Sequence, residues 1–101
     1  MKHAARRTKV YHVTTPNFRS NGNLSKHASG KFELVADVDT DDLNLAFRLT
    51  NDVGWNWWLN PEVSAYVKPC RSTSVGDVIV LPDGEAYVVL AAGFERLAST
   101  A

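Results

Sequence analysis

Several features that often reveal a function are scarce or missing in this sequence of 101 residues. It has one cysteine, Cys70, so no internal disulfide can form and a reducing compartment is expected. The longest apolar stretch, Ala86–Ala92, is too short to cross a bilayer. The basic N-terminus is not followed by the apolar segment of a secretion signal. We therefore expect a cytoplasmic protein with no role in a membrane.

Motifs for catalysis and for cofactor binding are also missing. There is no glycine-rich phosphate-binding loop, and no histidine follows His27 to act as a base for the hydroxyl and thiol groups of Cys70–Ser74. A pairing of Cys70 with His12 would depend on the fold alone. One cysteine and three widely spaced histidines do not form the ligand pairs of a zinc site. The sequence favours a protein without enzyme activity, metal or cofactor.

The acidic stretch DVDTDD at residues 37–42 has the first half of a calcium-loop pattern. Asp37, Asp39 and Asp41 occupy its first, third and fifth positions. The sixth position is Asp42 where the pattern needs glycine, and the twelfth is Arg48 where it needs the bidentate glutamate. We interpret the stretch as the start of a helix, where carboxylates cap free backbone N–H groups.

The segment Cys70–Leu97 is predicted to form the centre of the fold. It contains two β-branched runs, Asp77–Leu81 and Ala86–Ala91, separated by the turn sequence Pro82-Asp83-Gly84. Neither run alternates cleanly between apolar and polar residues, which is typical of strands covered on both faces. The segment therefore predicts a β-hairpin in the middle of a sheet, followed by a short strand over Phe94–Leu97.

The remaining pattern predicts an α+β domain whose antiparallel sheet has four to five strands and one helix packed on a face. Further strands are expected at Lys9–Thr14, Lys31–Val38 and Glu62–Lys68, with a loop over Asn17–Gly30. A helix is expected from about Asp41 to Asn51, capped by Asp39 or Thr40 and ended by Asn51 or Gly54. Its predicted buried face consists of Leu43, Ala46, Phe47 and Thr50. A hydrophobic content of 45% supports one compact domain over residues 9–101, preceded by a flexible basic tail at 1–8.

Charge is distributed very unevenly along the chain. Seven basic and no acidic residues precede Glu33, whereas eleven acidic and four basic residues follow from Glu33 onward. The basic segment could bind nucleic acid, or it could fold against the acidic body and be neutralised there. The first alternative would use Lys2, Arg6, Arg7, Lys9 and Arg19.

All three tryptophans fall within the segment Trp55-Asn56-Trp57-Trp58. A small domain has little interior, and rings at these positions cannot all point the same way. We therefore expect Trp57 or Trp58 to complete the core and one tryptophan to stay at the surface. Exposed tryptophan is typical of protein interfaces. The predicted contact surface consists of Trp55, Asn56, Trp57, Trp58, Arg71, Ser72 and Ser74, with Arg71 donating to a partner's carboxylate.

The last two-thirds of the chain resembles the YodL-like domain found in small proteins of phages, plasmids and integrative elements. The matching residues are Ala46-Phe47 and Leu49-Thr50-Asn51, then Trp58 and Asn60, then Arg71–Ile79, and finally Tyr87, Val89 and Gly93-Phe94. The resemblance implies a mobile-element accessory protein in a bacterial cell, but it supplies no catalytic residues.

Together these features favour a non-catalytic protein-binding module. The resemblance implies an accessory role for a phage or mobile element and, by analogy with such proteins, modulation of a host system such as a defence complex. Self-association through the tryptophan surface is the first form of binding to expect, before an unidentified host protein. Nucleic-acid binding through the basic N-terminal segment is the alternative.

Overall fold

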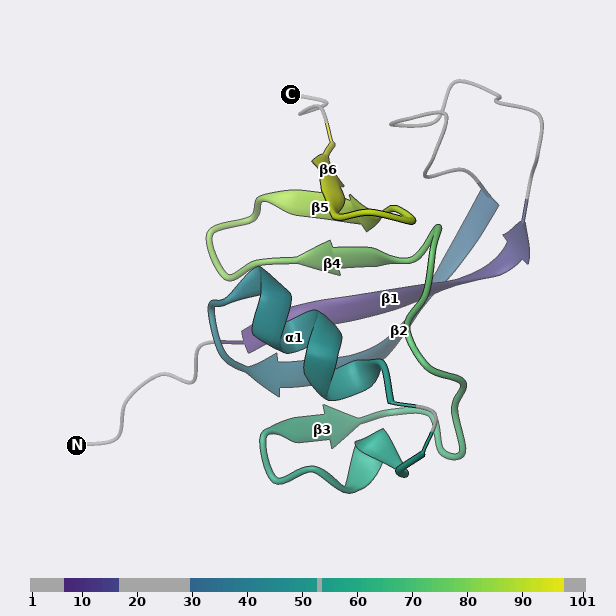
Figure 1. The fold of residues 1–101 in the computed structure, drawn as a ribbon, viewed down its shortest axis with the longest axis vertical. Helices are drawn as coiled ribbons and strands as arrows, with labels where there is room; N and C mark the ends of the chain where they lie inside the picture. Colours follow the sequence, from purple (N-terminus) through teal and green to yellow (C-terminus); the bar gives the residue numbers. More distant parts are fainter. Residues whose placement is uncertain (1–6, 17–29, 53, 98–101) are drawn as a thin grey trace.

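The computed structural model describes residues 7–16, 30–52 and 54–97. Within these ranges the chain forms one antiparallel sheet of six strands, with one α-helix packed against a face (Figure 1). The predicted α+β class is confirmed, with one strand more than the upper number expected. No helix in the described ranges is long and apolar enough to cross a membrane.

The strands follow the order β3-β2-β1-β4-β5-β6 across the sheet. Their bounds are Arg7–Pro16 for β1, Gly30–Asp39 for β2, Val63–Ala65 for β3, Val78–Val80 for β4, Ala86–Val89 for β5 and Phe94–Arg96 for β6. Every strand that the sequence predicted is present. The boundary of the predicted tail is wrong, because β1 begins at Arg7 and Thr8 is fully buried. Residues 17–29 of the predicted loop lie outside the described ranges, and Gly30 already belongs to β2.

The long strands β1 and β2 form the main hairpin of the sheet, pairing from Arg7↔Asp39 to Pro16↔Gly30. The β4–β5 hairpin expected at the centre is interior, but β5 is separated from the sheet edge only by β6. Its turn forms as predicted, since Gly84 adopts a φ of +92° and its N–H donates to the carbonyl of Leu81 over 2.9 Å. A residue with a Cβ would be strained at that φ.

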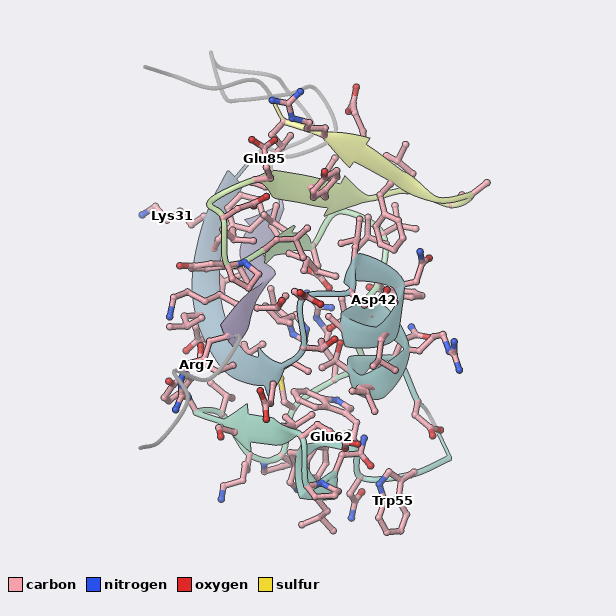
Figure 2. All side chains as sticks on the ribbon, turned by 90° about the vertical axis from the view of Figure 1, so that its left-hand side faces the viewer. Arg7, Lys31, Asp42, Trp55, Glu62 and Glu85 are labelled. Carbon is pink, nitrogen blue, oxygen red and sulfur yellow. The ribbon has the colours of Figure 1, made fainter. Side chains whose placement is uncertain are left out.

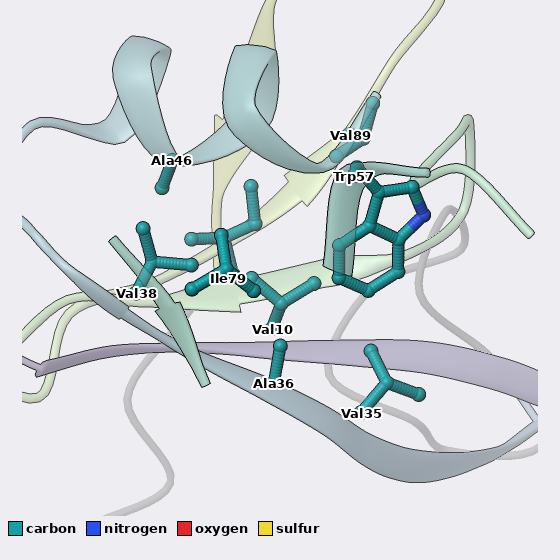
Figure 3. Packing of buried hydrophobic residues seen from close by; sticks show 9 residues of the cluster. Val10, Val35, Ala36, Val38, Ala46, Trp57, Ile79 and Val89 are labelled. Carbon is teal, nitrogen blue, oxygen red and sulfur yellow. The ribbon is translucent and has the colours of Figure 1, made fainter. Parts of the chain in front are cut away.

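Alternation along the strands buries apolar side chains on both faces of the sheet. Val10 and its partner Ile79 belong to the larger cluster, which also includes Ala46 of the helix (Figure 3). We call this side the α1 face. Val78 and Val88 belong to a smaller cluster on the opposite face. This arrangement explains why β4 has no polar alternation.

Two irregularities in the pairing of β1 with β2 bend the hairpin. The register shifts between Val10 and Tyr11, and again between Val13 and Thr15. Extra residues at such bulges increase the local twist. Phe32 of β2 packs against the smaller cluster of β4 and β5, which supplies cover for the face opposite the helix.

The helix α1 spans Leu43–Thr50, and Ala46 and Thr50 on its inner side are buried. Its N-cap is Asp42, whose Oδ1 accepts the N–H of Leu45 over 3.1 Å. The predicted cap at Asp39 or Thr40 is therefore wrong by two or three residues, because β2 continues to Asp39 and delays the helix start. The predicted end at Asn51 is confirmed.

Candidate functional site

The tryptophan segment divides between the interior and the surface. Trp57 begins a 3-10 turn, η1 (Trp57–Leu59), and is 1% exposed within the larger apolar cluster. Trp58 is half-buried and packs edge-to-face on Trp57, with ring centroids 5.8 Å apart. Trp55 is 52% exposed. The expectation that one tryptophan lies at the surface is confirmed, and that residue is Trp55.

Hydrogen bonds hold the exposed Trp55 ring in one orientation. Its indole N–H donates to Oδ1 of Asn60 over 3.0 Å, and Nδ2 of Asn60 donates to the carbonyl of Leu49 at the end of α1 over 3.0 Å. Leu59, next to Asn60, is 58% exposed. Trp55, Asn56 and Leu59 are thus exposed residues on one short turn, which we call the Trp55 corner. Figure 2 shows Trp55 at the end of the molecule opposite Glu85.

The predicted residues of the Cys70–Asp77 loop are organised around a buried carboxylate. Asp77 is fully buried and accepts both terminal nitrogens of Arg71, each over 2.7 Å. The backbone N–H groups of Val13 and Ser74 also donate to it, over 2.9 and 2.8 Å. The hydrogen bond from Arg71 to Asp77 raises the pKa of the guanidinium. Each oxygen of the carboxylate therefore has a charged partner and a backbone partner.

Arg71 has a structural task inside the molecule. Besides Asp77, its terminal nitrogens donate to the carbonyls of Val13 and Ser72 and to Oγ of Ser74. Its backbone carbonyl accepts the indole N–H of Trp57 over 3.2 Å. Arg71 therefore already uses its guanidinium within the molecule, although the side chain is 45% exposed. Its contact with a partner's carboxylate stays a prediction.

A second cluster of side chains forms where this loop meets β1, and the sequence alone did not predict that its members are in contact. Sγ of Cys70 lies 3.5 Å from Nδ1 of His12, and Nε2 of His12 lies 2.9 Å from Oγ1 of Thr73. His12 projects from β1 and is 3% exposed, and Thr73 is fully buried. The sequence separates the cysteine and the histidine by 58 residues, so no local spacing could have indicated their contact.

This Cys–His–Thr arrangement has the order of a nucleophile, a base and a group that orients the base. Its electrostatics oppose that use. Burial lowers the pKa of His12 to about 4, with Asp77 raising it and Arg71 lowering it further. Burial also raises the pKa of the Cys70 thiol. Transfer of the thiol proton to the imidazole is thus disfavoured at both ends, and a neutral hydrogen-bonded pair results.

The basic residues of the alternative site fall partly within the structure. Arg7 and Lys9 both contact the buried carboxylate of Asp37, over 3.5 and 3.3 Å. Tyr66, just after β3, donates its hydroxyl proton to the same carboxylate. Lys2, Arg6 and Arg19 lie outside the described residues. In the described part of the chain, no group of three or more His, Cys, Asp or Glu residues could hold a metal ion.

Comparison of the chain with protein-family models, with curated proteins and with solved structures returned no match. The resemblance to the YodL-like domain therefore stays an expectation. The structure itself therefore describes the class of molecule. It is a small α+β domain with an exposed tryptophan that a hydrogen bond to Asn60 holds in place.

Proposed function

We propose that this chain is a non-catalytic protein-binding module whose contact surface centres on the Trp55 corner. The observation that carries the proposal is the half-exposed Trp55 ring, fixed by Asn60 beside the exposed Leu59. An aromatic ring held before binding loses little conformational entropy when a partner covers it. Such pre-orientation is typical of the residues that dominate binding energy.

The exposed area is large enough to contribute measurably to association. A tryptophan side chain buries up to about 250 Å² when fully covered, so covering the exposed half removes roughly 100 Å² from water. At about 25 cal/mol per Å², this corresponds to about 2.5 kcal/mol. Leu59, 58% exposed, adds apolar area to the same surface.

The predicted site is revised by these contacts. Trp55 and Asn56 are exposed and stay in the proposed surface, with Leu59 added to them. Trp57 supports the surface from the interior. The loop residues Ser72 and Ser74 stay a prediction for the rim.

The proposed setting is the bacterial cytoplasm, where the module would serve a phage or another mobile genetic element. This part rests on the resemblance to the YodL-like domain, and modulation of a host defence complex follows only by analogy with such accessory proteins. A second copy of this chain, bound through the Trp55 corner, is the first partner to test.

The experiment combines light scattering of the purified protein with capture of partners from a bacterial lysate. We expect Trp55→Ala to abolish the association that the unchanged protein shows, with the melting temperature almost unchanged. Tyr66→Ala is the matched control, since that ring is 57% exposed but its hydroxyl donates to Asp37 of β2, outside the Trp55 corner. An association that survives Trp55→Ala would refute the proposed surface.

Nucleic-acid binding is the second candidate, and the contacts of Arg7 and Lys9 bear on it in two ways. Their pairing with Asp37 supports a basic segment neutralised by the acidic body. Yet the two side chains are 55% and 44% exposed, so both keep a solvent-facing side.

A further inference from the structure

We infer that Tyr66, Arg7 and Lys9 form a binding site for single-stranded nucleic acid on the sheet face opposite α1. The inference rests on the second candidate function and gives it a location. It also adds an aromatic residue, Tyr66, to the predicted nucleic-acid site. The sequence did not indicate this residue, because it lies far from the basic segment along the chain.

One buried carboxylate brings the three side chains together. Asp37 is 4% exposed, and it contacts Arg7 and Lys9 of the neighbouring strand and the hydroxyl of Tyr66 on its other side. The sheet register explains this convergence, because Asp37 is paired with Lys9 in β1 and with Ser64 in β3. Figure 2 shows Arg7 on the side of the sheet that faces away from α1.

The Tyr66 ring has the properties of a stacking surface. It is 57% exposed, while its hydroxyl is anchored to Asp37 and its backbone N–H donates to the carbonyl of Val35 over 2.8 Å. The ring is therefore held at both ends with more than half of its surface accessible. Stacking of a base on such a ring is independent of sequence, because every base has a π-face.

The two cations are positioned for phosphate contacts beside that ring. Each reaches Asp37 through one nitrogen, and about half of each side chain stays exposed to solvent. A guanidinium carries five N–H donors and an ammonium three, so one contact does not exhaust either group. The alternation of an aromatic ring with cations is the arrangement that single-strand binding proteins use.

Local acidic groups limit the strength of this site. Asp37 offsets one of the cations, and the exposed Asp39, opposite Arg7 in the sheet, offsets part of the other. Lys68, two residues after Tyr66, is exposed. Binding should therefore rely on stacking as much as on charge. With two phosphate contacts, the logarithm of the association constant should fall with the logarithm of salt concentration with a slope of about −1.4.

The test uses fluorescence anisotropy of the full chain with a labelled oligo(dT) of about ten nucleotides. Tyr66→Leu removes the aromatic face but keeps an apolar side chain, and we expect it to weaken binding about tenfold. Trp55→Leu removes the other aromatic ring that is more than half exposed among the described residues, and it should leave the affinity unchanged. Equal effects of the two substitutions, or no effect of Tyr66→Leu, would overturn the site.

A second variant tests the role of the shared carboxylate in the opposite direction. Asp37→Asn keeps an acceptor for the Tyr66 hydroxyl but removes the charge that competes with phosphate, so affinity should rise by about fivefold at low salt. A purely structural role for Asp37 predicts no gain. Circular dichroism and the melting temperature establish that each variant is folded.

The outcomes separate the site from the function on which it rests. Suppose that Tyr66→Leu leaves the affinity unchanged and that a Lys2→Gln, Arg6→Gln double variant abolishes binding. That result would overturn this site and assign nucleic-acid binding to the N-terminal segment. No binding of oligo(dT) or of a matching RNA at low salt would overturn both.

Discussion

The buried imidazole of His12 makes the stability of the fold depend on pH in a predictable direction. Burial lowers its pKa in the folded protein to about 4, whereas the ordinary value of 6.5 applies to the unfolded chain. Above the higher value both states carry a neutral ring, so the folded state has its full stability. As the pH falls from 6.5 towards 4, His12 becomes protonated in the unfolded chain but stays neutral in the folded protein. Stability is lost through this window, and below it His12 causes no further change.

The size of the effect follows from the two pKa values. Their difference corresponds to about 3 kcal/mol of unfolding free energy. For a domain of this size, 1 kcal/mol lowers the melting temperature by about 4–8 °C, so His12 alone should lower it by more than about 10 °C. Thermal unfolding followed by circular dichroism between pH 7 and pH 4 measures this loss.

The matched variant is His12→Gln, which can still hydrogen-bond Thr73 but does not titrate. We expect it to be less stable at pH 7 by about 1–3 kcal/mol, because it fits the buried site less well. Both proteins share every other titrating group, so the difference between their pH profiles isolates His12. Parallel profiles would refute the reasoning, as would an NMR titration that gives the His12 ring a pKa near 6.5.

Three smaller predictions concern the contacts around α1 and the Cys70–Asp77 loop. Asp42→Ala removes the N-cap of α1 and should lower the unfolding free energy by about 1 kcal/mol in urea titrations; an unchanged midpoint would show that the cap contributes nothing. Cys70 should react slowly with iodoacetamide at pH 7.5 and much faster in denaturant, because its thiol is neutral and partly buried. Rapid labelling of the folded protein would contradict the neutral pair with His12. Arg71→Lys keeps the charge but loses the paired contacts with Asp77, so it should cost about 2 kcal/mol; equal stability would mean that the geometry of the guanidinium is unimportant.

Local sequence patterns predicted the elements of this fold well. The apolar run of β4 indicated a strand covered on both faces, and Ile79 and Val78 do enter different clusters. The turn at Gly84 and the end of α1 at Asn51 follow from the preferences of single residues. Such features depend on neighbours within a few positions, which the sequence displays directly.

Features that depend on pairing between distant segments could not be predicted in this way. Nothing local indicates that β1 lies between β2 and β4, and that placement alone brings His12 to Cys70. The role of Arg71 was missed for the same reason. Its partner Asp77 is six residues away, but the carboxylate becomes a buried site only when β1 supplies the N–H of Val13.

The tryptophan segment contains one feature that the sequence predicted and one that it did not. Its composition predicted that one ring stays outside, but the 3-10 turn that decides between the rings was not apparent from the sequence. That turn directs Trp57 inward, where its indole N–H reaches the carbonyl of Arg71. It leaves Trp55 at the surface, tied to Asn60.

Site-specific photo-crosslinking tests most directly whether the Trp55 corner is the contact surface. A benzophenone amino acid at the exposed position Leu59 would stand next to Asn60, the residue that holds the Trp55 ring, without replacing either partner of that hydrogen bond. The matched control position is the exposed Asp83, two residues before Glu85. Figure 2 shows Glu85 at the other end of the molecule from Trp55. Irradiation in a bacterial lysate and in the purified protein should give a discrete adduct from position 59, lost on Trp55→Ala, and none from position 83. Equal adducts from both positions, or an adduct at 59 that persists in Trp55→Ala, would contradict the account.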